Sequence, residues 1–258
     1  MTQSSVAVTV GGETVVLNAS PDIRAQLPAC GLVPQGLRGS PVRAVVLTKG
    51  DVDHVAGLLS LRENSPFTIH ATQSTLAILD QPIFRVLNQD HVARAAIQLD
   101  QKFQPLPGLT VTAFAVPGKV ALWQEEGEPD TALIGEQTVG LRLDHGGRTA
   151  FYIPGCAAVT DDLLDRLTDA DLLLFDGTVW ADDDMERSGT GAKTGARMGH
   201  LAMDGPHGSI ARLAGLRARR IFTHINNTNP VLQPGSPERA AVAAAGWELA
   251  HDGMEIDP

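Results

Sequence analysis

Short apolar segments alternate with polar loops along the whole chain. Residues 4–10 and 14–17 flank Gly11-Gly12, a pattern that predicts a β-hairpin, because paired glycines favour the tight turn between two strands. Residues 42–47 are apolar apart from Arg43, which is typical of a strand buried on both faces. We expect the remaining strands at residues 68–71, 109–116, 137–143, 149–154, 172–175, 220–223, 248–250 and 254–256.

Helical spacing of apolar positions is clearest at residues 55–62, where Val55, Leu58 and Leu59 recur on one face. Residues 28–41 are rich in Pro and Gly and predict a loop. Strands predominate early, strand–helix units recur later, and no internal repeat or linker divides the chain. We therefore predict a single α/β domain over residues 1–258, with packed sheets and helices outside them. The other helices are expected at residues 21–26, 74–79, 161–167, 209–216 and 238–245.

Composition makes the expected core aliphatic and limits the expected partners. Hydrophobic residues make up 43% of the 258 residues but aromatic residues only 4%, so Ala, Val, Leu and Ile must build the core. The formal net charge of −10 argues against a nucleic-acid surface, which needs basic stripes, and against docking on anionic lipid. We expect no nucleic-acid partner and no membrane association.

Cysteine content and hydropathy favour a reduced compartment. Cys30 and Cys156 provide neither a disulfide framework nor a Cys-x-x-Cys metal site. The sequence shows no apolar run of the ~18–20 residues that a membrane helix needs, and no secretory signal at its start. These features predict a cytoplasmic protein.

The apolar segment at residues 42–47 runs into a group of ionisable side chains. Asp51, Asp53 and His54 follow it closely, with Lys49 beside them. In α/β folds such strand-end residues are set by loops and often form sites. Crowded carboxylates need a cation or a shared proton, and histidine beside them suits Fe(II), Mn or Zn. The alternative is that the acids only cap the helix that follows.

Three more ionisable side chains lie at strand ends or in loops. His224 ends one strand, Asp176 ends another, and His200 lies in a Gly-rich loop. Each has an ordinary alternative, since loops contain histidines for other reasons and Asp-Gly often starts a turn. Together they predict a metal centre assembled from separate loops.

The stretch 48–54 reads TKGDVDH and resembles the H-x-H-x-D-H signature of the metallo-β-lactamase superfamily. It keeps the final Asp-His and has Lys49 and Asp51 in place of the two leading histidines. With this departure, the chain resembles the pyrroloquinoline quinone biosynthesis protein B (PqqB) family. Matching stretches occur at 2–7, 17–24, 51–59, 61–63, 116–119, 152–157, 174–178, 193–195, 198–200, 224–230 and 251–253.

The resemblance implies the αββα sandwich of that superfamily and a step in making pyrroloquinoline quinone (PQQ) from a ribosomal peptide with a crosslinked Glu and Tyr. It implies iron-dependent, O2-using hydroxylation of that tyrosine ring, with Fe(II) as the metal and Zn as the alternative. An older assignment for the family is transport of the cofactor toward the periplasm. The metal ligands implied by position are Asp51, Asp53, His54 and His224.

Members of the family usually begin with an extra strand and a Cys-rich segment that resembles a structural zinc site. This sequence starts past that region. We therefore predict a fold that lacks the N-terminal strand and the structural zinc and that leaves one sheet edge uncovered.

The replaced imidazoles change the expected chemistry. Carboxylate in place of imidazole makes the site more anionic, which favours one Fe(II) with open positions for O2 and substrate over a zinc hydrolase centre. Lys49 cannot bind metal while protonated, so we expect it to offset the acids or to meet an anionic oxygen group. We assign catalytic roles to Lys49, Asp51 and His200. Asp176 is expected to be a further metal ligand or to orient an imidazole.

A tyrosine-derived substrate carries several carboxylates, which cationic and amide side chains are suited to bind. The alternative is that the loop at residues 182–208 is simply solvated. The candidate substrate-binding residues are Lys193, Arg197, Asn226, Asn227 and Asn229.

Two other functions stay open at this point. One is a non-catalytic carrier for PQQ or its precursor. The other is a zinc hydrolase of the same fold, for instance a phosphodiesterase, although Lys49 and Asp51 replace the histidines that it needs. The expected partner is a small peptide-derived substrate, and a homodimer or contacts with other proteins of the PQQ pathway are left open.

Overall fold

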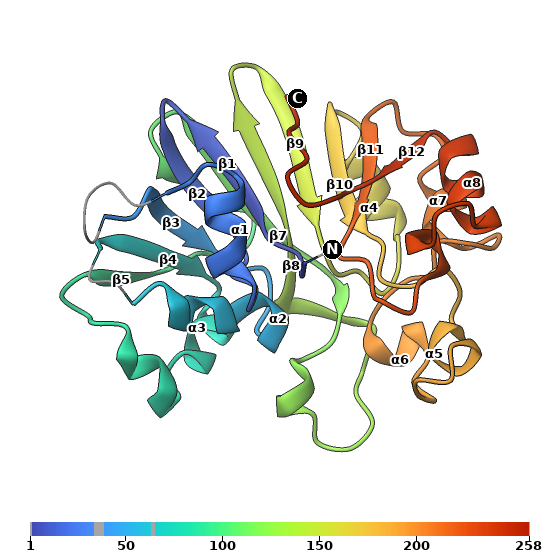
Figure 1. The fold of residues 1–258 in the computed structure, drawn as a ribbon, viewed down its shortest axis with the longest axis horizontal. Helices are drawn as coiled ribbons and strands as arrows, with labels where there is room; N and C mark the ends of the chain where they lie inside the picture. The colour runs from blue at the N-terminus through green and yellow to red at the C-terminus, as the bar shows by residue number, and fades with distance from the viewer. Residues whose placement is uncertain (1, 34–38, 63–64, 258) are drawn as a thin grey trace.

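Two β-sheets face each other with helices on their outer sides (Figure 1) in the computed structural model, which describes residues 2–33, 39–62 and 65–257. Within this part of the chain, the first sheet orders five strands as β1 (Val6–Val10), β2 (Glu13–Leu17), β3 (Val42–Val46), β4 (Phe67–Ala71) and β5 (Val92–Ala96). The second orders seven as β12 (Trp247–Leu249), β11 (Arg219–Thr223), β10 (Leu172–Asp176), β9 (Arg148–Ile153), β8 (Leu133–His145), β7 (Leu109–Gly118) and β6 (Lys102–Leu106).

Each sheet contains a parallel half that ends at the same edge of the sandwich. Strands β2 to β5 pair in parallel, as do β9 to β12, whereas β1–β2 and β6 to β9 are antiparallel. Helices follow or connect these strands. They are α1 (Ile23–Ala29), α2 (Val52–Val55), α3 (Gln73–Ile78), α4 (Asp161–Arg166), α5 (Asp184–Arg187), α6 (Gly195–Met198), α7 (Ser209–Arg212), α8 (Pro237–Ala244) and the 3-10 turns η1 (Ala56–Ser60), η2 (Pro82–Val86), η3 (Leu122–Gln124) and η4 (Pro230–Leu232).

Side chains that alternate between the two faces of each strand produce the four layers of the sandwich. Val15 in β2 joins the apolar cluster between the sheets, whereas Val16 faces the cluster under α1, η1 and α3. In β10, Leu174 lies between the sheets and Phe175 faces the cluster under α4 and α8. Because successive side chains of a strand point to opposite faces, one strand lines two cores. The predicted αββα sandwich is confirmed.

Most expected elements are present with shifted ends. The hairpin is confirmed as β1 and β2, with Gly11 and Gly12 at φ values of 59° and 84° that glycine adopts readily. The helix expected at 55–62 starts earlier, as α2, and continues as η1. The loop expected at 28–41 is wrong for residues 28–29, which belong to α1, and residues 34–38 lie outside the described residues.

Three differences concern strands. The prediction of a strand at 254–256 is wrong. These residues have no regular structure, and Met254 and Ile256 pack against the apolar cluster between the sheets. Strands β5 and β6 were not expected. Their sequences, VARAA and KFQPL, contain alanine, charged residues and a proline, which are depleted in strands, and they lie at sheet edges where such residues are tolerated.

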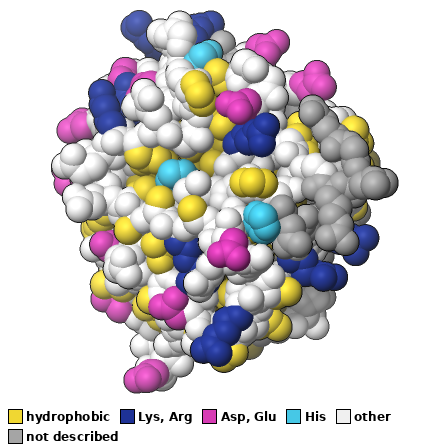
Figure 2. Space-filling view, turned by 90° about the vertical axis from the view of Figure 1, so that its left-hand side faces the viewer, with side chains coloured by type: hydrophobic (Ala, Val, Ile, Leu, Met, Phe, Trp, Pro, Cys, Tyr) yellow, Lys and Arg dark blue, Asp and Glu magenta, His cyan; other side chains and the backbone are white. Residues whose placement is uncertain are grey.

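No helix among the described residues is both long and apolar enough to cross a membrane. Figure 2 shows the face at the left of Figure 1, where acidic and basic side chains are interspersed with apolar ones. The charges on this face are therefore mixed rather than gathered by sign.

Close backbone packing at Gly57 fixes α2 and η1 against the loop after β2. Gly57 N donates to Ala19 O at 2.9 Å, and Ala19 N donates to His54 O at 2.7 Å. A Cβ atom on residue 57 would clash with the carbonyl oxygens of Ser20 and Ala19, which are backbone atoms and cannot rotate away. The loop after β2 thus holds the helix that carries Asp53 and His54.

We predict that Gly57→Ala lowers the free energy of unfolding by about 1–3 kcal/mol, the usual range for an overpacked core position. The measurement is the urea denaturation midpoint. Gly215→Ala is the matched control, because a Cβ there meets nothing within 4 Å. Equal midpoints for wild type and Gly57→Ala would contradict this prediction, because the backbone at residues 18–20 would then move aside with no loss of stability.

Candidate metal centre

The loops that follow β3, β9, β10 and β11 meet at one edge of the sandwich, the lower edge in Figure 1, where α2 and α6 lie. Residues at the carboxyl ends of parallel strands are free of the sheet's hydrogen-bond pattern and project into this edge. The described structure brings Asp53, His54 and His224 together there, and Asp176, His200 and His224 form a second group that shares one histidine.

The segment after β3 crosses from the first sheet to the second. Thr48 O accepts from Val139 N at 2.9 Å, and Lys49 forms a β-bridge with Thr138 of β8. Asn18 Oδ1 accepts from Thr48 N at 2.8 Å, and the asparagine is completely buried at a φ of 60°. These bonds place Lys49 between the sheets and start α2 beside the second sheet.

Asp51 occupies the position before α2, but its side chain makes no capping hydrogen bond to that helix. The interpretation that these acids only cap a helix is therefore not supported. His54 lies inside α2 with no exposed surface.

The buried ring nitrogens of His54 lack hydrogen-bond partners within the described part of the chain. Neither of its ring nitrogens has a hydrogen-bond partner among the described residues, although Nδ1 lies 3.1 Å from Asp53 Oδ1. A buried polar atom without a partner costs about 1–3 kcal/mol, so such a histidine needs another ligand. Burial lowers the pKa of His54 to about 4, so the imidazole is neutral near pH 7 and can offer a lone pair to a cation. The donor set fits a metal ion.

Asp53 and His224 complete this group. His224 Nε2 lies 2.8 Å from Asp53 Oδ2, and the rings of His54 and His224 are 5.0 Å apart. Burial opposes ionisation of Asp53, but His54 and His224 outweigh it and hold the pKa of the carboxyl well below its usual range. One carboxylate and two imidazoles thus converge from α2, which follows β3, and from the end of β11.

The backbone and the side chain of His224 are both constrained. Its φ of 57° is left-handed, which is uncommon for a residue with a Cβ and occurs mostly where surrounding contacts enforce it. Thr178 Oγ1 lies 3.0 Å from His224 O and 2.8 Å from His224 Nδ1. With Nδ1 held by Thr178, Nε2 faces Asp53.

Asp176 binds the ring of His200 through a hydrogen bond. Its Oδ2 accepts from His200 Nδ1 at 2.6 Å and from Cys156 N at 2.9 Å. Its Oδ1 accepts from Thr178 Oγ1 at 2.7 Å. Both oxygens of this fully buried carboxylate are therefore in use, and the geometry supports the orienting role that we considered for Asp176 over direct ligation.

Among the described residues, only one ring nitrogen of His200 makes a hydrogen bond. Its Nδ1 is held by Asp176, so Nε2 lies on the opposite side of the ring, and the ring stacks 5.3 Å from His224. Burial lowers the pKa of His200 below its usual value. The side chain is therefore a neutral imidazole, held in place, with a lone pair available beside the first group.

The structure does not bring Asp51 into either group. Asp51 Oδ2 lies 3.2 Å from Lys49 Nζ, and Oδ1 accepts from Leu122 N at 2.9 Å. Burial alone would lower the pKa of Lys49, but Asp51, Asp53 and Asp176 raise it above its usual value, so the ammonium stays charged. In this geometry Asp51 partners Lys49 instead of completing the ligand set.

The expected substrate-binding residues differ in what they can reach. Lys193 and Asn227 are exposed, and Asn226 is half-buried. Asn229 is buried, and its amide donates to Gly177 O, in the loop after β10, at 3.0 Å and accepts from Val231 N, in its own loop, at 3.1 Å. Arg197 donates to Glu125 Oε2 at 2.9 Å. Asn229 thus supports the loop and is not available to a ligand.

Two residues of the site were not assigned from the sequence. Thr178 joins Asp176, His200 and His224 through one hydroxyl, and the only sequence signal is a hydroxyl residue two positions after a strand-end acid. Gly155 leaves room for its neighbours, since a Cβ there would lie 3.3 Å from Lys49 Nζ and 3.6 Å from His200 Cε1. Lys49 and His200 are therefore close neighbours.

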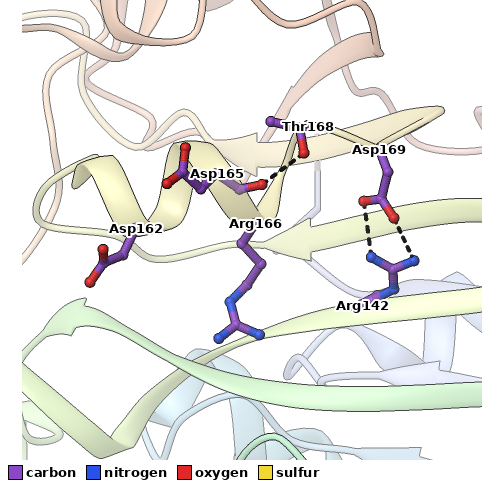
Figure 3. A pocket seen from close by; sticks show the side chains of 6 residues that line it. All are labelled: Arg142, Asp162, Asp165, Arg166, Thr168 and Asp169. Atoms are coloured by element: carbon purple, nitrogen blue, oxygen red, sulfur yellow. Dashed lines mark hydrogen bonds and ion pairs between the residues drawn. The ribbon is translucent and has the colours of Figure 1, made fainter.

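A hollow between α4 and β8 lies apart from this centre (Figure 3). Its cations are already paired, Arg142 with Asp144 and Asp169 and Arg166 with Asp100. Asp169 precedes β10, so the hollow lies at the opposite end of that strand from Asp176. Its lining residues are Arg142, Asp162, Asp165, Arg166, Thr168 and Asp169.

Comparisons with known proteins agree with this architecture. The family model described as the β-lactamase superfamily domain matches residues 13–225. The chain is 57% identical over 257 residues to "Coenzyme PQQ synthesis protein B" of Ruegeria pomeroyi, covering 98% of this chain and 87% of the relative. It is 55% identical to the protein of the same name from Methylorubrum extorquens, with 99% and 87% covered.

Solved structures give the same result. Zn²⁺-bound PqqB from Methylobacterium extorquens superposes with a TM-score of 0.97 at 55% identity, covering 100% of this chain and 88% of that one. A diphosphatase of the PhnP family superposes with a TM-score of 0.69 at 21% identity, covering 98% of this chain and 82% of that one, a likeness of fold alone.

We predict that Zn²⁺ raises the melting temperature of the metal-free protein, because an ion bound only by the folded state stabilises it, by about 2.7 kcal/mol at 100 times Kd. His54→Gln should weaken Zn²⁺ binding at least about tenfold, the lower end of losses seen around metal sites. The readouts are the Zn²⁺-induced shift and a zinc titration. His207→Gln, at an exposed position, is the control. Undiminished zinc affinity of His54→Gln would exclude His54 as a ligand.

Proposed function

This chain belongs to the coenzyme PQQ synthesis protein B family of the β-lactamase superfamily, and on that premise we propose that it acts in PQQ biosynthesis as an iron-dependent, O2-using hydroxylase. The substrate in this proposal is the tyrosine ring of a Glu–Tyr crosslinked, peptide-derived precursor. The family name supports the pathway, and the reaction is our inference from the site.

The observation that carries the reaction is the donor set of Asp53, His54 and His224. Two histidines and one carboxylate with open positions are the ligand set of non-haem Fe(II) oxygenases. A zinc hydrolase of this superfamily needs imidazoles where this chain has Lys49 and Asp51. Those two residues pair with each other instead of adding ligands, which leaves room beside the first group. The geometry therefore favours one redox metal over a two-zinc hydrolase.

The bound iron would supply O2 activation, and the chain's own residues supply positioning and proton handling. Hydroxylation inserts one oxygen atom of O2 into a ring C–H bond and reduces the other to water, so it consumes two electrons from an external reductant and two protons. His200 is suited to the proton step, because Asp176 holds its Nδ1 and leaves Nε2 able to take a proton from a phenol or return it.

Lys49 sets the charge of the centre. Its ammonium is nearly buried, pairs with Asp51 and is also attracted by Asp53 and Asp176. One fixed cation among three carboxylates lowers the repulsion among them and offers a positive charge to an anion close to His200. We propose that Lys49 steadies anionic groups of the substrate or of reduced oxygen rather than binding the metal.

Zinc is the competing occupant that a specific observation favours. The relative from Methylobacterium extorquens was solved with Zn²⁺ bound. Two imidazoles and a carboxylate also hold Zn²⁺ in hydrolases. Zinc and iron forms of this chain therefore have to be compared directly.

The decisive experiment reconstitutes the protein anaerobically with Fe(II), adds the crosslinked precursor and a reductant, and then admits ¹⁸O2. We predict one ¹⁸O atom in the ring of each product molecule by mass spectrometry, and none with the Zn²⁺ form. His200→Gln should lower kcat about 10²-fold, the lower end for a lost acid–base group, while His207→Gln should match wild type.

Tight precursor binding without oxygen incorporation in the Fe(II) form would contradict the proposal and favour a carrier. Cleavage of the precursor by the Zn²⁺ form, without uptake of ¹⁸O from O2, would contradict it in favour of a hydrolase.

A further inference from the structure

The loop between β7 and β8 lies against the metal-bearing segment. Leu122 N donates to Asp51 Oδ1 at 2.9 Å, and Trp123 Nε1 donates to Gly50 O at 3.2 Å. Leu122 and Trp123 are nevertheless about half exposed, with 54% and 45% of their surface accessible. In Figure 1 this loop projects below the sheets beside α6. Polar contacts thus attach the loop to the metal-bearing segment, while the side chains of Leu122 and Trp123 remain outside the hydrophobic core.

One acid of this loop is turned inward. Glu125 lies between two cations, with Oε1 at 2.6 Å from Lys119 Nζ and Oε2 at 2.9 Å from Arg197 Nη2. Its side chain is 7% exposed, whereas the neighbouring Glu126 and Glu128 are exposed. Arg197, followed by Lys119, holds the pKa of Glu125 below its usual range, so the group is an anion.

The two cations lie next to the centre. Arg197 belongs to α6, three residues before His200. The Lys119 side chain runs along Gly199, where a Cβ would lie 3.2 Å from Lys119 Cγ. Lys119 O accepts from Thr138 Oγ1, and Thr138 bridges to Lys49. Arg197 therefore shares a segment with His200, and Lys119 is linked to Lys49 through Thr138.

The charges of Lys119, Arg197 and Glu125 do not balance. Two cations share one carboxylate, so the group keeps a positive charge in a chain of net charge −10. A pair of neighbouring cations, here the nearly buried Lys119 and the partly exposed Arg197, is stabilised by any carboxylate of suitable geometry, whether it belongs to the loop or to a ligand. The same loop forms one wall of a neighbouring pocket of about 290 Å³, lined by Gln124, Gln137 and residues of α3 but not by the two cations. Space and polar groups for a ligand thus adjoin the loop.

We propose that Lys119 and Arg197 form a carboxylate-binding subsite at the rim of the metal centre, and that Glu125 occupies it until a substrate carboxylate displaces it. This inference rests on the proposed function, because the crosslinked precursor carries carboxylates beyond its reacting ring. Displacement of Glu125 frees the loop that holds Asp51 and Gly50, so binding of the correct substrate is coupled to a change beside Lys49.

The test measures binding in the Zn²⁺ form, where no turnover interferes, by calorimetry with two probes: glutarate and the crosslinked precursor. Glu125→Gln removes the internal competitor and should tighten both by about tenfold, as expected when only about a tenth of the subsite is free in wild type. Arg197→Gln should weaken both by about tenfold or more, because it removes a charge-assisted hydrogen bond. Glu126→Gln makes the same charge change at an exposed neighbour and should leave both unchanged.

Trp123 fluorescence gives an independent readout of the loop. Glutarate should change it in wild type, and Trp123→Phe should abolish the response. If Glu125→Gln weakens glutarate binding or leaves it unchanged, Glu125 only braces the loop and the subsite is wrong. If glutarate binds as predicted while the precursor binds to none of the variants, the subsite stands and the proposed function fails.

Discussion

A completely buried imidazole without a hydrogen-bond partner among the described residues is the constraint on which the metal centre depends. His54 is held there by close packing of Gly57 against the loop after β2, and its pKa is too low for protonation to satisfy it near neutral pH. A cation shared with Asp53, whose Oδ1 lies 3.1 Å from His54 Nδ1, would offset that cost. Asp53 and His224 stand where such a ligand would be shared.

Hydrogen bonds around the two other histidines turn this requirement into a defined geometry. Thr178 and Asp176 fix the Nδ1 atoms of His224 and His200, which leaves both Nε2 atoms on the opposite sides of their rings. Orientation of imidazoles through the far nitrogen is how metal sites commonly control their ligands. Next to these histidines, Lys49 pairs with Asp51, and Lys119 and Arg197 share Glu125.

The sequence predicted the parts of this arrangement that local chemistry determines. Strand-end acids and histidines predicted that loop residues converge, and the described structure brings Asp53, His54 and His224 together. The apolar pattern predicted packed sheets with helices outside them. The resemblance placed Asp51 among the ligands, whereas in the structure its two oxygens contact Lys49 and the Leu122 amide, a pairing that no local pattern shows. The pairing of Glu125 with Arg197 spans 72 positions and depends on how two loops fold back, for which no local pattern exists. Likewise β5 and β6 form through pairing at sheet edges and not through propensity.

Anomalous diffraction from crystals of the metal-loaded protein tests the central claim most directly, with data collected on both sides of the iron or zinc absorption edge. We predict one anomalous peak bounded by Asp53, His54 and His224, about 2.0–2.2 Å from a ring nitrogen of each histidine and from a carboxylate oxygen. A peak that leaves His54 without a contact, or none at this edge of the sandwich in crystals shown to contain metal, would contradict the account.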